Sequence, residues 1–337
     1  MKHILVLTSI HGEQPVLDKI RTGVEANNWQ CVIAGDTISK PIRSSESLTF
    51  YSIIDQLSSS YSYAKLAPTR NYCRKNLAYL KAMEMGADVI VETDDDNLPY
   101  DIFFKDREHT FDVRMTHEKG FINIYRYFTE NQKIWPRGFS LEDIQRDLTD
   151  FNYLNIEKKY CPIQNGLVDG EPDVDAIYRL ILDLPFQFEH KNRKIALSKN
   201  SWCSFNTQNT SFFKEFFPLM YHPATPMFRE ADIVRSFVIQ RILKEFDLSM
   251  MIHSATVYQS RNYHSLIDDF RQEVRLYSYI KKICQELNET EIHSKKTKFK
   301  ESMKKCYQIF KPYRIVTESE FSLIDAWFDD LELIGIV

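Results

Sequence analysis

The feature that most constrains the fold is an alternation of short apolar runs and amphipathic stretches in the first half of the chain. The apolar runs "HILVLTS", "WQCVIAGD" and "ADVIVETD" predict strands, and "PVLDKIRTGVEANN" and "TRNYCRKNLAYLKAMEMG" predict helices between them. The third run is continuously apolar, which is typical of a central parallel strand covered on both faces. The pattern therefore predicts an α/β fold with an open, mostly parallel central sheet.

The rest of the chain is less regular up to about residue 200. We expect short strand-like pieces in "GFINIYRYF", a helix that begins at Ser140 with Asp143 completing a capping box, and a helix in "DVDAIYRLILDL". The stretch "READIVRSFVIQRILKEF" predicts a long helix, because apolar residues recur every four positions. Beyond residue 266 the sequence is lysine-rich with a helical pattern. We therefore expect a domain over residues 1–265 and a helical C-terminal extension over residues 266–337.

Composition narrows the class of protein. A net charge of -4 over 337 residues provides no broad basic surface, so we expect no nucleic-acid partner. The six cysteines are scattered without a CxxC pair, which indicates reduced thiols in a cytoplasmic protein. The first apolar run is too short for a signal peptide, and no run approaches the length of a membrane span. Peripheral membrane contact through the lysine run 295–300, and a homodimer through the helical tail, both stay open.

Polar side chains follow each of the three predicted strands where the strand ends. Thr8 and Ser9 follow the first, Asp36 follows the second, and the aspartates of "ADVIVETDDDNLPY" follow the third. In open α/β sheets, ligands bind outside the carboxyl ends of the strands. We therefore expect Thr8, Ser9 and Asp36 to contact a ligand beside the aspartate cluster.

The aspartate cluster Asp94, Asp95 and Asp96 predicts a divalent cation, since a shared Mg²⁺, Mn²⁺ or Ca²⁺ makes such crowding favourable. An EF-hand loop does not fit, because Pro99 stands where glycine is needed and Lys105 where the bidentate glutamate belongs. A haloacid-dehalogenase-type phosphatase fits poorly, because Leu98 stands where Thr or Val is usual. The Asp-x-Asp motif of a GT-A glycosyltransferase fits best, with Mn²⁺ or Mg²⁺ held by Asp94 and Asp96 against the leaving diphosphate. The alternative is an acidic turn that is exposed to solvent and binds no ligand.

Four further residues are candidates for the same site. Arg70 and Arg74 lie four apart, so we expect them to share a helix face and to contact the phosphates, although a solvated face would look the same. Asp232 opens the long helix and is a candidate general base, with simple helix capping as the alternative. His264 in "RNYHS" is a candidate third metal ligand, and His253 competes for that role.

Five motifs taken in order resemble the STELLO-type glycosyltransferase-like proteins. They are "RKNLAYLKAMEMGADVIVETDDDNLP", "IWPRGF", "QNGLVDGEPDVDAIYRL", "FNTQNT" and "FREADIVRSFVIQRIL", and the resemblance runs from about residue 60 to 265, with the helical segment after 266 outside it. The order is more distantly similar to the reversibly glycosylated polypeptides, which include UDP-arabinopyranose mutases. The resemblance implies a GT-A fold and a nucleotide-sugar site with a divalent metal. It implies that Asp94, Asp95 and Asp96 contact metal and nucleotide, that Asp173 and Asp175 contact the sugar, and that Asp232 is the acidic residue at the helix start.

Together these observations predict a metal-dependent glycosyltransferase. It would transfer a sugar from a UDP-linked nucleotide sugar to the hydroxyl of a glycan or lipid-linked acceptor, by an inverting displacement. Three alternatives stay open: a nucleotide-sugar mutase, a non-catalytic nucleotide-sugar-binding scaffold, and a phosphatase built on the same aspartates.

Overall fold

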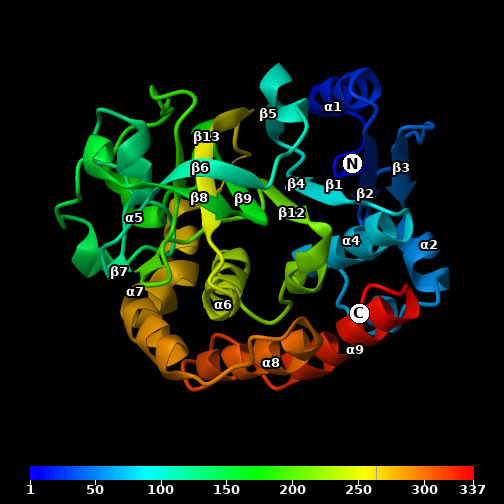
Figure 1. Cartoon of the computed structure of the whole chain (residues 1–337). Helices are drawn as coiled ribbons and strands as arrows, with labels where there is room; N and C mark the ends of the chain where they lie inside the picture. Colours follow the sequence, from blue (N-terminus) through cyan, green and yellow to red (C-terminus); the bar gives the residue numbers. More distant parts are fainter. Residues whose placement is uncertain (263) are drawn as a thin grey trace.

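The computed structural model describes residues 1–262 and 264–337, and within them eleven strands join into one large sheet (Figure 1). The strand order is β3-β2-β1-β4-β12-β9-β13-β10-β6-β8, with β5 paired to β13, while β7 and β11 form a separate pair. The strands are β1 His3–Thr8, β2 Gln30–Ala34, β3 Leu48–Tyr51, β4 Val89–Thr93, β5 Asn97–Pro99, β6 Thr110–Met115, β7 Gly120–Phe121, β8 Ile156–Tyr160, β9 Ile163–Gly170, β10 Lys194–Ala196, β11 Ser201–Trp202, β12 Asn209–Phe213 and β13 Met250–Gln259.

The first half of the sheet is parallel, as the strand–helix alternation predicts. β1 pairs in parallel with both β2 and β4, and β2 with β3. β12 then runs antiparallel to β4 and to β9, and β13 runs parallel to β9. The expected fold class is confirmed: this is an α/β protein with the Rossmann-like sheet of a GT-A fold, and the carboxyl ends of β1, β2 and β4 meet at one edge.

Helices cover both faces of this sheet (Figure 1). They are α1 Pro15–Ala26, α2 Ile53–Ser58, α3 Ser62–Leu66, α4 Lys75–Glu84, α5 Ala176–Ile181, α6 Ala231–Glu245, α7 Leu266–Glu289, α8 Phe299–Phe310 and α9 Ser319–Leu333. On one face, Leu17 and Ile20 of α1 share a buried cluster with Leu5 of β1. On the other, Leu77 of α4 and Ile239 of α6 belong to a larger core. Burial on both faces explains why the central strands carry continuous apolar runs.

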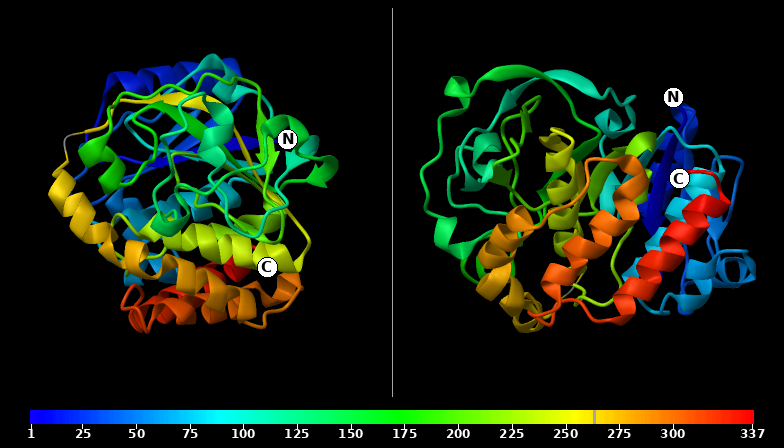
Figure 2. Two further views of the ribbon diagram at one scale, coloured as in Figure 1. Left: turned by 90° about the vertical axis from the view of Figure 1, so that its left-hand side faces the viewer. Right: turned by 60° about the horizontal axis from the view of Figure 1, so that its bottom comes forward.

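The three C-terminal helices form an outer layer beneath α6, and Figure 2 shows them side by side. Leu276 of α7, Met303 of α8 and Trp327 of α9 are buried in the same core as α4 and α6. The helical character expected after residue 266 is therefore present, and the layer shares its packing with the rest of the chain. The division of the chain at residue 265 stays a prediction. Among the helices described, none has both the length and the apolar character that crossing a membrane requires.

Four local expectations were wrong. The sequence pattern missed β3, a four-residue edge strand, so the strand that ends at the aspartates is β4. Arg70, with φ +54°, lies before the helix. The helical segment starts with a 3-10 turn at Tyr72, which the Asn71 side chain caps. Arg70 and Arg74 therefore share no helix face. Ser140 begins only a short 3-10 turn without a side-chain cap, and "GFINIYRYF" forms two residues of β7 followed by a 3-10 helix.

Candidate active site

A cavity of about 620 Å³ opens at the carboxyl ends of β1, β2 and β4. It brings together residues from distant parts of the chain, as the strand order requires. Its lining includes these residues proposed from the sequence: Thr8, Ser9, Asp36, Arg70, Arg74, Asp94, Asp95, Asp96, Asp173, Asp232 and His264. Asp175 does not line it, and neither does His253, the alternative metal ligand.

Asp94 is held by two residues that the sequence reasoning did not single out. Tyr72 donates a short hydrogen bond from its hydroxyl to Asp94 Oδ1, and Lys75 Nζ lies 3.1 Å from the same oxygen. Lys75 is fully buried and also donates to the carbonyl oxygen of Thr93 over 2.7 Å. Tyr72 stands in the turn before α4 and Lys75 is the first residue of α4, in the stretch "NYCRK", where only Arg74 had seemed relevant. The first aspartate therefore already has a positive partner.

Asp95 and Asp96 differ in how far their oxygens are satisfied. Asp95 Oδ2 accepts a hydrogen bond from Ser9 Oγ over 2.6 Å, which ties the cluster to β1. Asp96 Oδ2 accepts from Gln259 Nε2 over 3.0 Å, but Asp96 Oδ1 is buried and has no hydrogen-bond partner among the described residues. Burial, together with the charge of Asp94, raises the pKa of Asp96 to about 7. A buried carboxylate oxygen without a donor fits a cation ligand, because such an oxygen is costly to leave unpaired.

The third metal ligand is not preformed. His264 lines the cavity, with Nδ1 3.7 Å from Asp269 Oδ1. His253, the competing candidate, lies elsewhere and lines a second cavity. Within residues 1–262 and 264–337, no three His, Cys, Asp or Glu side chains lie close enough together to hold a metal ion. A metal would thus draw on Asp96 first, with its other ligands from the substrate or from side chains that move.

The residues expected to contact the nucleoside and the phosphates differ in how exposed they are at the cavity. Asp36 accepts hydrogen bonds from the backbone N–H groups of Thr37 and Asn71, so its carboxylate holds the turn that precedes α4. Arg74 is buried and donates to Gln56 Oε1 and to the carbonyl oxygen of Ala67. Arg70 is exposed at the cavity. Of the two arginines proposed for the phosphates, Arg70 is therefore the more accessible.

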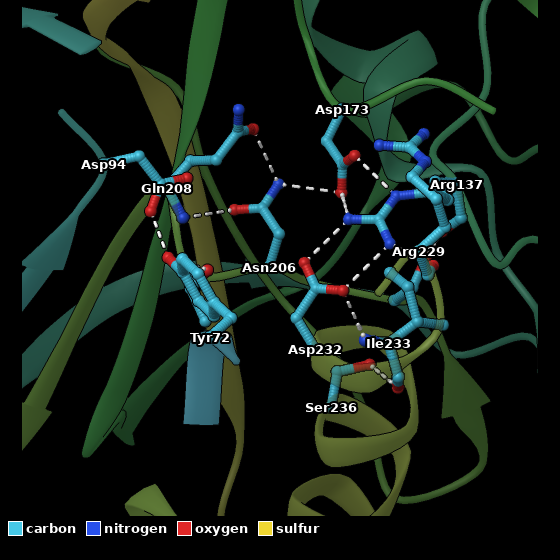
Figure 3. Close-up of polar contacts among 12 residues, drawn as sticks. Tyr72, Asp94, Arg137, Asp173, Asn206, Gln208, Arg229, Asp232, Ile233 and Ser236 are labelled. Atoms are coloured by element: carbon cyan, nitrogen blue, oxygen red, sulfur yellow. Dashed lines mark hydrogen bonds and ion pairs between the residues drawn. The ribbon is translucent and has the colours of Figure 1, made fainter. Parts of the chain in front are cut away.

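A buried arginine forms the opposite wall of the cavity (Figure 3). Arg137 donates to both oxygens of Asp173, over 2.7 and 3.0 Å, and to both oxygens of Asp232, over 2.9 and 2.7 Å. Burial alone would lower the pKa of Arg137, but the two carboxylates outweigh it and raise that pKa. Burial raises the pKa of Asp232, whereas at Asp173 the pull of Arg137 exceeds the effect of burial and lowers the pKa. The Arg137 guanidinium therefore holds the carboxylates of Asp173 and Asp232 next to each other in one buried wall of the cavity.

The turn before β12 links this wall to the aspartate cluster. Asn206 Nδ2 donates to Asp173 Oδ2 over 3.1 Å and to Gln208 Oε1 over 3.2 Å (Figure 3). Thr207 Oγ1 lies 3.0 Å from the Tyr72 hydroxyl. A line of polar contacts thus runs from Asp94 through the "FNTQNT" turn to Asp173. Arg137 was missed because a single arginine in "IWPRGF" carries no charge pattern, and only the fold reveals its two partners.

Asp175 has a structural position outside the cavity. Its carboxylate caps α5 by accepting from the Tyr178 N–H over 2.7 Å, and it accepts from Trp135 Nε1 over 2.7 Å. Burial raises the pKa of Asp175 to about 7. The two aspartates of "PDVDA" therefore lie apart, and only Asp173 lines the cavity.

The C-terminal helices contribute buried carboxylates to the walls of the cavity. Glu273 of α7 accepts from Arg229 Nε over 2.8 Å, and Asp269 of α7 accepts from Arg261 over 2.7 Å. Glu320 of α9 accepts from the backbone N–H of Thr225 over 2.8 Å, in the segment that leads to α6. Since Arg229 and Arg261 line the cavity, the outer layer helps to shape it.

Comparison with known proteins finds similarity to one family of glycosyltransferases. A family model described as STELLO glycosyltransferases matches residues 229–337. Two relatives in Arabidopsis thaliana, the probable glycosyltransferases STELLO2 and STELLO1, are 23% and 22% identical over 339 residues, which cover 94% of this chain. The chain is similar in sequence to the STELLO glycosyltransferases. It spans 43% of the length of each of the two plant proteins.

The family match corrects one expectation. The helical segment after residue 266 was expected to lie outside the resemblance, yet the match with the STELLO family model runs through α7, α8 and α9 to residue 337. Their buried carboxylates and shared core give this a physical reason, because the helices support the same cavity. The charged surface of the segment concealed that role in the sequence.

Proposed function

We propose that this chain is a glycosyltransferase that transfers a sugar from a nucleotide sugar, UDP-linked, to a hydroxyl acceptor. One observation carries the proposal: a single cavity at the strand ends joins a buried, unpartnered oxygen of Asp96 to the carboxylate of Asp232 on the opposite wall. One side is suited to a metal-bound diphosphate and the other to an acceptor hydroxyl. The family comparison supports glycosyl transfer as the reaction class.

The donor end depends on Asp94 and Asp96, which would hold Mn²⁺ or Mg²⁺. The metal, when bound, supplies positive charge against the diphosphate that leaves. Ser9 fixes Asp95 and so orients the cluster, while Lys75 compensates Asp94 before substrate arrives. The exposed Arg70 is placed to contact phosphate oxygens.

The acceptor end depends on Asp232. In an inverting displacement the acceptor hydroxyl attacks the anomeric carbon, the bond from that carbon to the diphosphate breaks, and Asp232 takes the hydroxyl proton. Burial raises the pKa of Asp232, which strengthens it as a proton acceptor, while Arg137 orients the carboxylate and favours its ionised form. The acceptor, a glycan or a lipid-linked sugar, would enter over the exposed Phe228 at the cavity rim.

A nucleotide-sugar mutase is the second candidate. Both oxygens of Asp232 already accept hydrogen bonds from Arg137, which favours a reaction that needs no free base for an external acceptor. Incubation with a UDP-sugar and no acceptor separates the two, because only a mutase then changes the sugar ring.

The test is thermal stabilisation by UDP, GDP and CMP sugars with and without Mn²⁺, because a ligand that binds only the folded state raises its stability. We expect a UDP-sugar to raise Tm in the presence of Mn²⁺, and Asp96→Asn to abolish the metal-dependent part. Asp268→Asn, which removes an exposed carboxylate of α7, is the matched control and should behave as wild type. No stabilisation by any nucleotide sugar would refute the proposal.

Transfer itself is tested at the other wall. Asp232→Asn should keep donor binding and lose transfer by about a hundredfold or more, the usual contribution of a general base. Full transfer activity in this variant would exclude Asp232 as the base. Donor binding without transfer or isomerisation in the wild type would instead identify a binding scaffold.

A further inference from the structure

A second cavity, of about 470 Å³, lies farther back along β13. Met251 and residues 253–256 of that strand line it, whereas Gln259 at the strand's end lines the first cavity. The remaining walls come from the segment after Pro99, from the turn before β10 and the start of β10, and from Phe111 of β6 and Gln164 of β9. Its volume lies within the roughly 300–1,000 Å³ of typical small-molecule sites.

The lining of this cavity is strongly basic. Five cationic side chains face two carboxylates, Asp106 and Glu108; the cations are Lys105, Arg107, Lys191, Arg193 and Lys194. Of these five, only Lys191 forms an ion pair within the described residues, at 2.9 Å from Asp169. The Asp106 side chain is 87% exposed, so it is well hydrated. Arg107, which is the buried one of the five, therefore lacks the carboxylate partner that most buried cations require.

Arg107 is the most deeply placed of them, with 8% of its surface exposed. Its guanidinium donates to Ser211 Oγ over 3.0 Å and to the carbonyl oxygens of Phe103 and Lys105. Each of these partners is neutral, so the hydrogen bonds are satisfied while the positive charge is not balanced. Burial lowers the pKa of Arg107 to about 10, and a guanidinium with that pKa is still charged at neutral pH.

Lys194 extends the positive wall, and the neutral His253 lies beside it. They are directly paired across β10 and β13, so their side chains project from the same face of the sheet. The Lys194 ammonium lies 3.9 Å from the centre of the Phe111 ring and forms no ion pair with the described residues. Burial, followed by the charge of Arg107, lowers the pKa of His253 to about 4, which agrees with a positive field in the cavity.

We propose that this second cavity binds a phosphate-bearing ligand, with Arg107 and Lys194 on its anionic group. A phosphomonoester carries up to two negative charges and several acceptor oxygens, which suits one planar guanidinium and neighbouring ammonium groups. The exposed Lys105 completes the basic rim, whereas the Arg193 guanidinium lies 4.2 Å from the centre of the Phe151 ring, which does not line the cavity. This site is separate from the strand-end cavity and does not rest on the glycosyltransferase proposal.

The test is titration with glycerol 3-phosphate, a soluble phosphomonoester, and with phosphatidylcholine vesicles containing phosphatidic acid. We expect one of the two probes to bind wild type, and Lys105→Gln with Lys194→Gln to weaken that binding by about tenfold for each lysine. The matched control, Lys282→Gln with Lys298→Gln, removes the same charge from α7 and from the turn before α8. It should leave binding unchanged, as should Asp96→Asn in the first cavity.

The two probes separate the sources of the phosphate. Binding of glycerol 3-phosphate identifies a soluble ester, whereas binding of the vesicles alone identifies a lipid headgroup, and either supports the site if the lysine variant weakens it. Lys105→Gln alone changes an exposed residue and gives a readable result even if the double variant is poorly folded. Absence of binding by both probes, equal loss in the control, or loss in Asp96→Asn would overturn the proposal.

Discussion

The two cavities share β13, but the arginines on the far wall of the first are paired differently from Arg107 in the second. In the strand-end cavity every deeply buried arginine of the far wall faces a carboxylate: Arg137 faces Asp173 and Asp232, and Arg229 faces Glu273. In the second cavity Arg107 faces a hydroxyl and two carbonyl oxygens. The first arrangement fixes side chains against each other, whereas the second leaves positive charge for a ligand to balance.

The difference shows what pairing does in each place. A carboxylate that accepts two hydrogen bonds from a guanidinium is oriented and kept ionised, which is what a general base or a sugar-binding group needs. An arginine with neutral partners is held in position but retains its attraction for anions. Substitutions that remove one buried cation from each cavity can therefore test whether the two cavities differ in this way.

The largest effect is expected for Arg137→Met. It leaves Asp173 and Asp232 buried without their cation, and removing one partner of a buried ion pair typically costs about 3–5 kcal/mol of folding stability. Urea unfolding at pH 7 measures the change. Arg271→Met, in which the arginine is 71% exposed and pairs with Asp268, is the control and should change stability by less than about 0.5 kcal/mol. Similar losses in both variants would show that the Arg137 network does not stabilise the wall.

An intermediate effect is expected for Arg107→Met. No carboxylate is left behind, so the loss is limited to orphaned neutral acceptors, about 1–2 kcal/mol, and is clearly smaller than for Arg137→Met. The two variants are compared in the same urea series. A loss for Arg107→Met equal to that for Arg137→Met would mean that Arg107 balances a carboxylate in solution, and the contrast between the cavities would fail.

The sequence was sufficient to predict which residues lie together at the carboxyl ends of the parallel strands. Thr8, Asp36 and Asp94 could be placed together because parallel strands end at one edge, and periodicity alone located β1, β2 and β4. The long helix α6 was equally readable from its apolar spacing. These inferences use local patterns and one rule of sheet topology.

The partners of these residues could not be predicted, because they depend on contacts between distant segments. Lys75 meets Asp94, and Arg137 meets Asp232, only after the chain has folded, and neither residue stands in a charge pattern. Arg74 looked like a phosphate ligand by spacing, yet a short 3-10 turn before α4 directs it towards Gln56. The buried carboxylates of the C-terminal helices were hidden in a segment whose composition resembles a solvated surface.

An effect of opposite sign is expected at Lys244 of α6, which lies in neither cavity. Its ammonium sits 2.9 Å from the centre of the Trp202 ring and has no hydrogen-bond partner among the described residues. Burial lowers the pKa of Lys244 to about 6. Between that value and the ordinary lysine pKa, the unfolded chain binds a proton that the folded chain does not, so stability rises with pH across this window.

Lys244→Met should therefore stabilise the protein by at least about 1–2 kcal/mol near pH 6, since it removes a buried amine without a partner. The advantage should shrink towards pH 10, at no more than about 1.4 kcal/mol per pH unit, because the wild-type amine loses its proton in the unfolded state as well. Urea unfolding of both proteins at several pH values measures it, with Lys282→Met, an exposed residue on α7, as the control without a pH-dependent difference. An advantage that is constant or grows with pH would show that Lys244 stays charged in the folded protein. Lys244 would then be a second buried cation, after Arg107, that this fold tolerates without a carboxylate partner.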